Sequence, residues 1–144
     1  MGDCIFCKIV NGELESSILY QDVKCTAFLD VQPVNPGHVL IVPNKHVELI
    51  CDLDDEIVSH MFVIAKQINR AIRNSSVRCE GINYFLADGE AAFQEVFHVH
   101  LHCFPRYGDD GFGLKFSDEY YNKPSRERLN DIANDIKCHL ENKD

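Results

Sequence analysis

The feature that most constrains the fold is a short segment in which histidines alternate with apolar residues. Residues 97–106 read FHVHLHCFPR. Successive side chains of a β-strand point to opposite faces of the sheet. The alternation therefore predicts a strand over 96–104 with His98, His100 and His102 on one face. The intervening apolar side chains face the other way, where they are suited to packing beneath a helix.

Four more segments rich in β-branched and aromatic residues predict further strands, at 17–20, 24–29, 39–42 and 82–87. Turn formers such as Asn35-Pro36-Gly37 separate them. Most connections are too short for the crossover helix that a parallel pair requires. We therefore expect a five-stranded, mainly antiparallel sheet.

Two segments carry apolar residues at three- and four-residue steps, the period of an amphipathic helix. One runs over about 57–72, and the other runs from about 125 to 140 with Pro124 at its entrance. His60 and His139 lie on these helices, where we expect them to face solvent. The predicted class is α+β, with one long helix on the sheet and a second, C-terminal helix.

Length and composition indicate one globular unit. The chain has 144 residues, of which 45% are hydrophobic and 26% charged. We expect a single domain, with a core over about 4–106 and a C-terminal extension with its helix over 107–144. No stretch approaches the roughly 18 apolar residues of a membrane span, and the first residues do not resemble a secretion signal. These features predict a cytoplasmic protein with no membrane partner.

Charge and cysteine content narrow the possible ligands. The formal net charge of −9 disfavours a broad grip on nucleic acid, so any anion must bind at a local site. Seven cysteines, an odd number, do not suit a closed disulfide framework. We interpret them as reduced thiols, some of them able to hold a metal.

The three strand histidines allow three interpretations. They could be unrelated polar residues on a solvent-facing strand. They could be ligands of one metal ion with an open catalytic position. Alternatively, one imidazole could attack phosphorus while its neighbours orient it and handle protons. Composition does not choose between these interpretations.

The spacing Gln94-x-x-x-His98-Val-His100-Leu-His102 resembles the signature of the histidine-triad family. Other segments follow the family pattern in the same order: CIFCKIVNGE at 4–13, AFLDV at 27–31, and PGHVLIVPNKH at 36–46. The resemblance extends from Cys4 to Arg106, and the Cys-x-x-Cys pair is typical of a bacterial branch. It implies that residues 1–144 form a single histidine-triad-like, nucleotide-binding domain.

The resemblance also implies catalytic roles. His100 matches the family's nucleophile, which forms a covalent nucleotidyl-imidazole that water then cleaves. His102 matches the histidine that contacts the phosphate and assists the leaving group. His38 matches an upstream histidine that hydrogen-bonds within the cluster, and His98 is the first histidine of the triad.

The implied substrate is a small purine nucleotide of adenosine or guanosine type. It would be a nucleoside phosphoramidate or a dinucleoside polyphosphate. Phe28, Asp30 and Val31 match positions of the base and ribose pocket. Gln94, together with His100 and His102, matches residues that hold the phosphate region.

A structural zinc ion is the only cofactor that the resemblance implies. Its ligands would be Cys4, Cys7, His46 and His98, which make a closed tetrahedral set with no place for an activated water. No organic cofactor is expected. The family, together with the incomplete helical cover of the predicted sheet, also implies a homodimer.

Three positions depart from the family pattern. Phe93 stands where glycine is usual, Ala87 replaces a common amide, and Glu95 replaces a small hydroxyl residue. These changes favour one alternative to the hydrolase or transferase, a nucleotide-binding regulatory protein with weak turnover. The spacing of the three triad histidines leaves a second alternative, a metal-dependent hydrolase that uses them as ligands.

Overall fold

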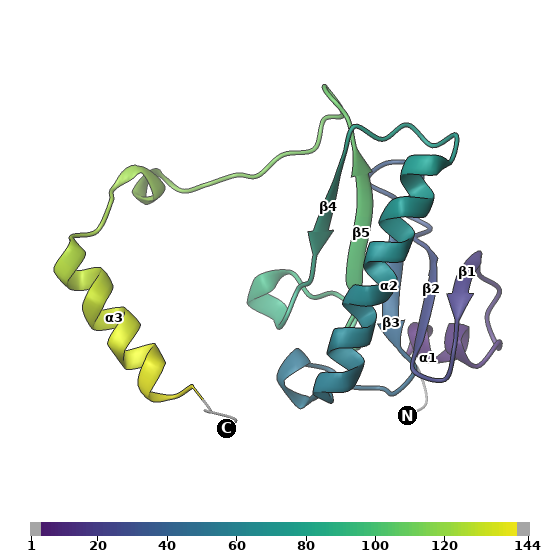
Figure 1. The fold of residues 1–144 in the computed structure, drawn as a ribbon, viewed down its shortest axis with the longest axis horizontal. Helices are drawn as coiled ribbons and strands as arrows, with labels where there is room; N and C mark the ends of the chain where they lie inside the picture. Colours follow the sequence, from purple (N-terminus) through teal and green to yellow (C-terminus); the bar gives the residue numbers. More distant parts are fainter. Residues whose placement is uncertain (1–3, 141–144) are drawn as a thin grey trace. The chain divides into compact units, whose positions relative to one another are not determined.

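A computed structural model of the chain describes residues 4–140. Its five strands form one antiparallel sheet in the order β1-β2-β3-β5-β4 (Figure 1). The strands are β1 (Ile18–Gln21), β2 (Cys25–Leu29), β3 (Val39–Pro43), β4 (Gly81–Phe85) and β5 (Leu101–Arg106). The chain divides into two compact units, of which the first ends at Phe112 and the second begins at Gly113.

The middle of the sheet is built from β2, β3 and β5. Strand β3 pairs with β2 over its whole length, from Val39↔Leu29 to Pro43↔Cys25. It pairs with β5 over only three positions, and one of these joins Leu40 to His102. The site histidine of β5 is thus anchored next to the most buried strand of the sheet.

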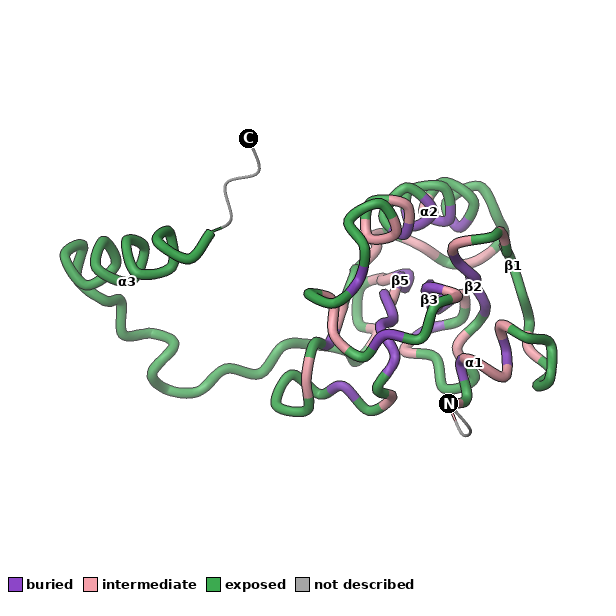
Figure 2. The backbone as a smooth tube through the Cα atoms, turned by 90° about the horizontal axis from the view of Figure 1, so that it is seen from below, coloured by how far each residue is buried: buried purple, intermediate pink, exposed green. Residues whose placement is uncertain are grey.

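Helix α2 (Asp55–Asn74) covers one face of the sheet. Its buried side chains, such as Ile64 and Ile68, form one cluster with Ile41 of β3 and Leu101 of β5. Figure 2 shows α2 with its buried side toward the strands and its exposed side away from them. The amphipathic period in the sequence is therefore satisfied by packing on the sheet.

A short helix, α1 (Ile5–Val10), lies against the opposite face. Phe6 and Ile9 of α1 form a second cluster with Phe28, Leu40 and Val42. Because strand side chains alternate between faces, Leu40 and Val42 point to α1 while Ile41 points to α2. Helix α1 is the element that brings the N-terminal cysteines to the site.

The second unit contains α3 (Arg126–Cys138) and a 3-10 turn over Asp118–Tyr121. The Ser125 side chain caps α3 by accepting a hydrogen bond from the Arg128 N–H at 3.1 Å. No residue of α3 is buried. Within this unit, Phe116 and Tyr120 stack with their ring centroids 4.0 Å apart.

The predicted α+β class, the five strands and both long helices are confirmed. Two details differ. Strand β5 begins at Leu101, so His98 and His100 precede it, and α1 was not predicted. The Val99 N–H donates to the Val47 carbonyl and not to a neighbouring strand, which explains the late start of β5. No helix within residues 4–140 is long and apolar enough to cross a membrane.

Candidate functional site

His100 is buried just before β5, with 5% of its surface exposed. Its Nδ1 lies 2.8 Å from the carbonyl oxygen of His98. A carbonyl can only accept, so Nδ1 must carry the hydrogen and donate it. The lone pair of the neutral ring is then on Nε2. This geometry leaves Nε2 free to act as a nucleophile.

His38 and His102 form a directed pair beside His100. The Val34 N–H donates to His38 Nδ1 at 3.0 Å, so the hydrogen of the neutral His38 ring is on Nε2. His38 Nε2 lies 2.9 Å from His102 Nδ1 and therefore donates to it. His102 must then carry its own hydrogen on Nε2. The Val34 N–H therefore determines which nitrogen of His38 carries the hydrogen, and His38 in turn determines which nitrogen of His102 carries it.

The three imidazoles are held in their neutral forms. Burial lowers the pKa of His100 and of His38 below the ordinary value. Burial, followed by the nearness of His100 and His38, lowers the pKa of His102 to about 4. The ring centroids of His100 and His102 are 4.9 Å apart. Near neutral pH the cluster therefore offers one lone pair and one N–H donor close together.

The structure brings only part of the predicted base and ribose pocket to the histidines. Asp30 Oδ2 lies 3.7 Å from His38 Nε2, and its Oδ1 accepts the Gln32 N–H at 2.9 Å. Phe28 is buried against Phe6, with the ring centroids 5.7 Å apart. Val31 is 97% exposed and contacts little of the protein.

Gln94 closes the loop that precedes the histidines. Its side chain accepts from the Gly89 N–H at 2.7 Å and donates to the Glu48 and Val96 carbonyls at 2.8 and 3.2 Å. Gln94 is 3% exposed, so its amide serves the loop backbone in this structure. Phe93 in the same loop is 82% exposed and has a positive φ of 69°.

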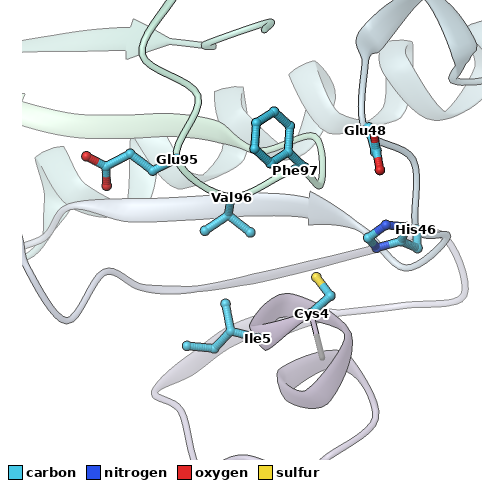
Figure 3. Close-up of a pocket in the computed structure, with 7 residues that line it drawn as sticks. All are labelled: Cys4, Ile5, His46, Glu48, Glu95, Val96 and Phe97. Carbon is cyan, nitrogen blue, oxygen red and sulfur yellow. The ribbon is translucent and has the colours of Figure 1, made fainter. Parts of the chain in front are cut away.

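The other two departures from the family pattern, Ala87 and Glu95, differ in exposure. Ala87 is buried with 2% exposure. Glu95 is exposed and lines a surface hollow near the N-terminal cysteines (Figure 3).

Four potential metal ligands meet where α1 approaches the segment before β5. The donor atoms of Cys4, Cys7, His46 and His98 all lie within 4.8 Å of one another. Sulfur-to-Nδ1 distances are 3.4 Å for Cys4–His98, 3.6 Å for Cys7–His98 and 3.3 Å for Cys7–His46. Tetrahedral zinc with ordinary bond lengths has a sulfur–nitrogen edge of about 3.5 Å. The donor set therefore fits a zinc ion.

The ring of His98 is oriented for such a site. Its Nε2 donates to the Pro43 carbonyl at 2.8 Å, which leaves the Nδ1 lone pair facing the two cysteines. Two surface hollows flank the ligands, with volumes of about 370 and 450 Å³. In Figure 3, Cys4 and His46 line the first hollow together with Ile5, Glu48 and Phe97.

Asp30, His38 and His102 form a second group with the spacing of metal ligands. The facing nitrogens of the two histidines already share a hydrogen bond. His60, expected to face solvent, is instead half-buried and pairs with Asp22 at 2.6 Å because α2 packs beside the β1–β2 turn. That solvent prediction is wrong for His60, whereas His139 is exposed.

Sequence reasoning missed two groups near the histidines. Phe6 packs edge-to-face with His98 and His100, with ring centroids 5.9 and 5.1 Å apart. Asn35 is a buried polar side chain in the turn before His38. The position of Phe6 between Cys4 and Cys7 could have suggested the first contact. The turn signal at Asn35-Pro36-Gly37 did not show that the Asn35 side chain is buried.

The sequence matches a family model described as HIT domain over residues 11–109. Protein hit of Bacillus subtilis is 41% identical over 138 residues, which cover 93% of this chain and 92% of that protein. A HIT-like protein of Borreliella burgdorferi is 45% identical over 117 residues, covering 80% and 84%. The adenosine 5'-monophosphoramidase of Candida albicans is 36% identical over 114 residues, covering 77% and 74%.

Solved structures of HIT-family and histidine triad proteins have folds similar to that of this chain. A HIT-family protein from Bacillus subtilis superposes with a TM-score of 0.88 at 37% identity, covering 98% of this chain and 99% of that one. A histidine triad nucleotide-binding protein from Candida albicans gives 0.82 at 31% identity, covering 94% and 95%. A zinc-bound histidine triad protein from Mycobacterium smegmatis gives 0.74 at 32% identity, covering 96% and 98%.

Proposed function

The chain belongs to the HIT domain family, and on that premise we propose that it is a nucleotide hydrolase or transferase acting through a covalent nucleotidyl-His100 intermediate. Its substrate is a purine nucleoside phosphoramidate or a dinucleoside polyphosphate. The observation that carries the proposal is the hydrogen bond from His100 Nδ1 to the His98 carbonyl, because it leaves the Nε2 lone pair free in a buried, neutral ring. The named activity of the Candida phosphoramidase supports the phosphoramidate class.

In the first step, the His100 Nε2 lone pair attacks phosphorus. The bond from phosphorus to the leaving group breaks, and its electron pair departs with the amine or phosphate. An amine leaving group then takes up a proton from solvent. The growing positive charge on the ring is stabilised by the Nδ1 hydrogen bond to the carbonyl. His102 donates from Nε2 to the phosphoryl group or the departing atom.

In the second step, water attacks the same phosphorus and the bond to His100 Nε2 breaks. The nucleoside monophosphate leaves and His100 regains its lone pair. The proton lost by water balances the proton gained by an amine leaving group, and it is released to solvent when the leaving group is a phosphate. Splitting one difficult displacement into two easier ones is the advantage of the covalent route. Asp30 is our candidate for binding the ribose hydroxyls, since its carboxylate lies beside the histidine pair.

We also propose that Cys4, Cys7, His46 and His98 hold a structural zinc ion. The Mycobacterium relative binds zinc, and the four donor atoms here have the spacing that a tetrahedral ion needs. Bound zinc would link α1 to the segment that carries His100. Four protein ligands leave no open position, and the Nδ1 of His98 faces Cys4 and Cys7. Both features favour the covalent route over a metal-dependent hydrolase that uses the three triad histidines.

We infer that the protein is a homodimer. Strand β4 is an edge of the sheet and presents Tyr84 and Phe85 at 43% and 44% exposure. Exposed apolar residues on an edge strand favour association. Light scattering after size-exclusion chromatography tests this inference, and a monomer mass at micromolar concentration would contradict it.

The function is tested by trapping the intermediate. Wild type and His100→Gly are mixed with a lysyl adenosine phosphoramidate, quenched without acid, and measured by intact mass while AMP release is followed. We expect an AMP adduct and turnover with wild type and neither with His100→Gly. His60→Asn, a histidine replaced outside the site, is the matched control and should behave as wild type.

Two other outcomes separate the alternatives. Nucleotide binding with neither adduct nor AMP would favour a nucleotide-binding regulatory protein. Loss of chemistry on brief chelation, before any loss of fold, would favour the metal-dependent hydrolase. Survival of turnover under brief chelation supports zinc as a scaffold.

A further inference from the structure

Asn35 is a buried amide that ties the turn before His38 to a distant segment. It is 4% exposed, and its Nδ2 donates to the Pro105 carbonyl and to Asp110 Oδ2, both at 2.9 Å. Both partners can only accept while Asp110 is ionised, so the orientation of the amide is fixed. The position therefore needs a side chain with two N–H donors on one nitrogen, which an alanine or an aspartate cannot supply.

Asp110 is itself held rigidly and in its charged form. Arg106 donates to both of its oxygens, from Nε at 2.5 Å and from Nη2 at 2.9 Å, a bidentate arrangement that fixes direction as well as distance. The Phe112 N–H adds a bond at 3.1 Å. The hydrogen bond from Arg106, against a smaller effect of burial, keeps the pKa of Asp110 well below its usual range. Its side chain is only 3% exposed.

The turn that Asn35 anchors contains the amide that directs the histidine pair. The Asn35 carbonyl accepts the His38 N–H at 3.1 Å, and the neighbouring Val34 N–H donates to His38 Nδ1. Gly37 packs the same turn against Val77 and Pro105. The Val34 N–H can hold its direction only while this turn keeps its place, and Asn35 is the side chain that fastens it.

From these contacts we propose that Asn35, clamped by Asp110 and Arg106, is a positioning residue that fixes the tautomer of His38 and through it that of His102. The clamp makes Val34 the donor to His38 Nδ1, so His38 gives its Nε2 hydrogen to His102 Nδ1. His102 then presents Nε2–H to the substrate. With the opposite tautomer, His102 would present a lone pair to an anionic phosphoryl group, which is repulsive.

A second contact reaches the same ring from the same segment. Phe112 packs its ring against Phe104 with centroids 5.3 Å apart, and Phe104 packs against His38 at 4.9 Å. The segment 106–112 therefore supports His38 both by hydrogen bonds through Asn35 and by ring packing. The effect of the tautomer on catalysis rests on the function proposed above, whereas the tautomer itself can be measured without any substrate.

The test is a two-bond proton–nitrogen NMR spectrum of the histidine rings at neutral pH. His38→Gln and His102→Gln assign the two signals. In wild type, both rings should carry hydrogen on Nε2 alone. Finding hydrogen on Nδ1 of either ring would overturn the proposal, whatever the variants do and whether or not the protein forms a His100 adduct.

The variants test the clamp. Asn35→Ala should convert the His38 and His102 signals from one tautomer to a mixture. It should lower kcat for an amine-leaving substrate by about 2- to 10-fold, in proportion to the fraction of His102 that no longer carries hydrogen on Nε2. Asp110→Asn, which keeps the shape, should act in the same direction and serves if Asn35→Ala does not fold. Asn83→Ala is the control, because Asn83 accepts a hydrogen bond from Arg106 Nη1, whereas Asp110 is held by Nε and Nη2 of the same side chain.

The outcomes distinguish the two proposals. Unchanged ring tautomers in folded Asn35→Ala or Asp110→Asn would refute the role of the clamp even if wild type is an active enzyme. Changed tautomers in a protein that forms no adduct would leave the clamp standing while the proposed function fails. A mixture in Asn83→Ala equal to that in Asn35→Ala would show a general loosening and would also overturn the proposal.

Discussion

Replacing Gly37 by alanine should destabilise the protein in a way that the geometry predicts. Gly37 has a φ of +93°, which L-residues rarely adopt. A Cβ there would lie 2.9 Å from Val77 Cγ1 and 3.5 Å from Pro105 Cγ. The turn carries the Val34 amide that binds His38, so the substitution strains the site as well as the fold.

Three effects set the size of the change. The left-handed backbone costs about 1–2 kcal/mol for a residue with a side chain. Overpacking against Val77 and Pro105 costs about 1–3 kcal/mol. The lower entropy of an unfolded chain with alanine offsets about 0.4–1 kcal/mol of this. Gly37→Ala should therefore lower the free energy of unfolding by about 1–5 kcal/mol, with a middle value of about 3 kcal/mol.

Urea unfolding followed by circular dichroism, at one protein concentration and fixed zinc, measures this loss. Gly12→Ala is the matched control, because Gly12 has a φ of +73° but nothing within 4 Å of the added Cβ. It should cost only about 1 kcal/mol. Gly37→Ala should cost less when it is added to Val77→Ala than when it is added to wild type, because the contact with Val77 Cγ1 is then gone. If Gly37→Ala costs no more than Gly12→Ala, the close contact with Val77 has been misjudged.

Three further predictions concern other parts of the molecule. Ser125→Ala removes the cap on α3 and should cost that helix about 1 kcal/mol, seen as faster hydrogen exchange of its amides; unchanged exchange would contradict the capping role. Cys7→Ser should leave little zinc bound after dialysis, and chelator should then no longer lower the melting temperature; full zinc content would refute the proposed ligand set. Burial opposes ionisation of Asp22, but hydrogen bonds from Tyr20, two backbone amides and His60 keep its pKa below the usual range. The stability that Asp22 contributes is therefore complete above the unfolded-state pKa of about 3.9 and is lost as pH falls below it. Asp22→Asn should destabilise the protein at neutral pH and differ progressively less from wild type below about pH 4, and a difference that does not shrink would contradict this assignment.

Local sequence patterns were sufficient for most of the secondary structure. The three- and four-residue spacing around Ile64 and Ile68 predicts α2 because a helix of that period buries one continuous stripe. Alternation predicts β5 for the same reason with a period of two. Helix α1 escaped prediction because its six residues are too few to show a helical period. The late start of β5 also escaped, because the partner of the Val99 amide lies about fifty residues away.

Some residues of the candidate site could also be found from local sequence, and others could not. Residue type and spacing alone singled out His98, His100 and His102 as neighbours, since three histidines at alternate positions of one short segment are uncommon. The resemblance to relatives supplied His38, Cys4 and Cys7, whose separation along the chain hides their proximity. The structure brings the donor atoms of the two cysteines, His46 and His98 within 4.8 Å of one another.

The sequence by itself determined the α+β class and the main elements, and it supplied the three histidines as candidate site residues, because each depends on local periodicity or on side-chain type. Only the tertiary structure decided which nitrogen of each imidazole carries the hydrogen. That choice depends on the His98 carbonyl, the Val34 amide and the Pro43 carbonyl. The tertiary structure also placed Asn35 against Asp110, a contact between residues 75 positions apart that leaves no local sequence pattern. Hydrogen-bond direction is a property of groups that meet in space, so it follows from packing and not from residue order.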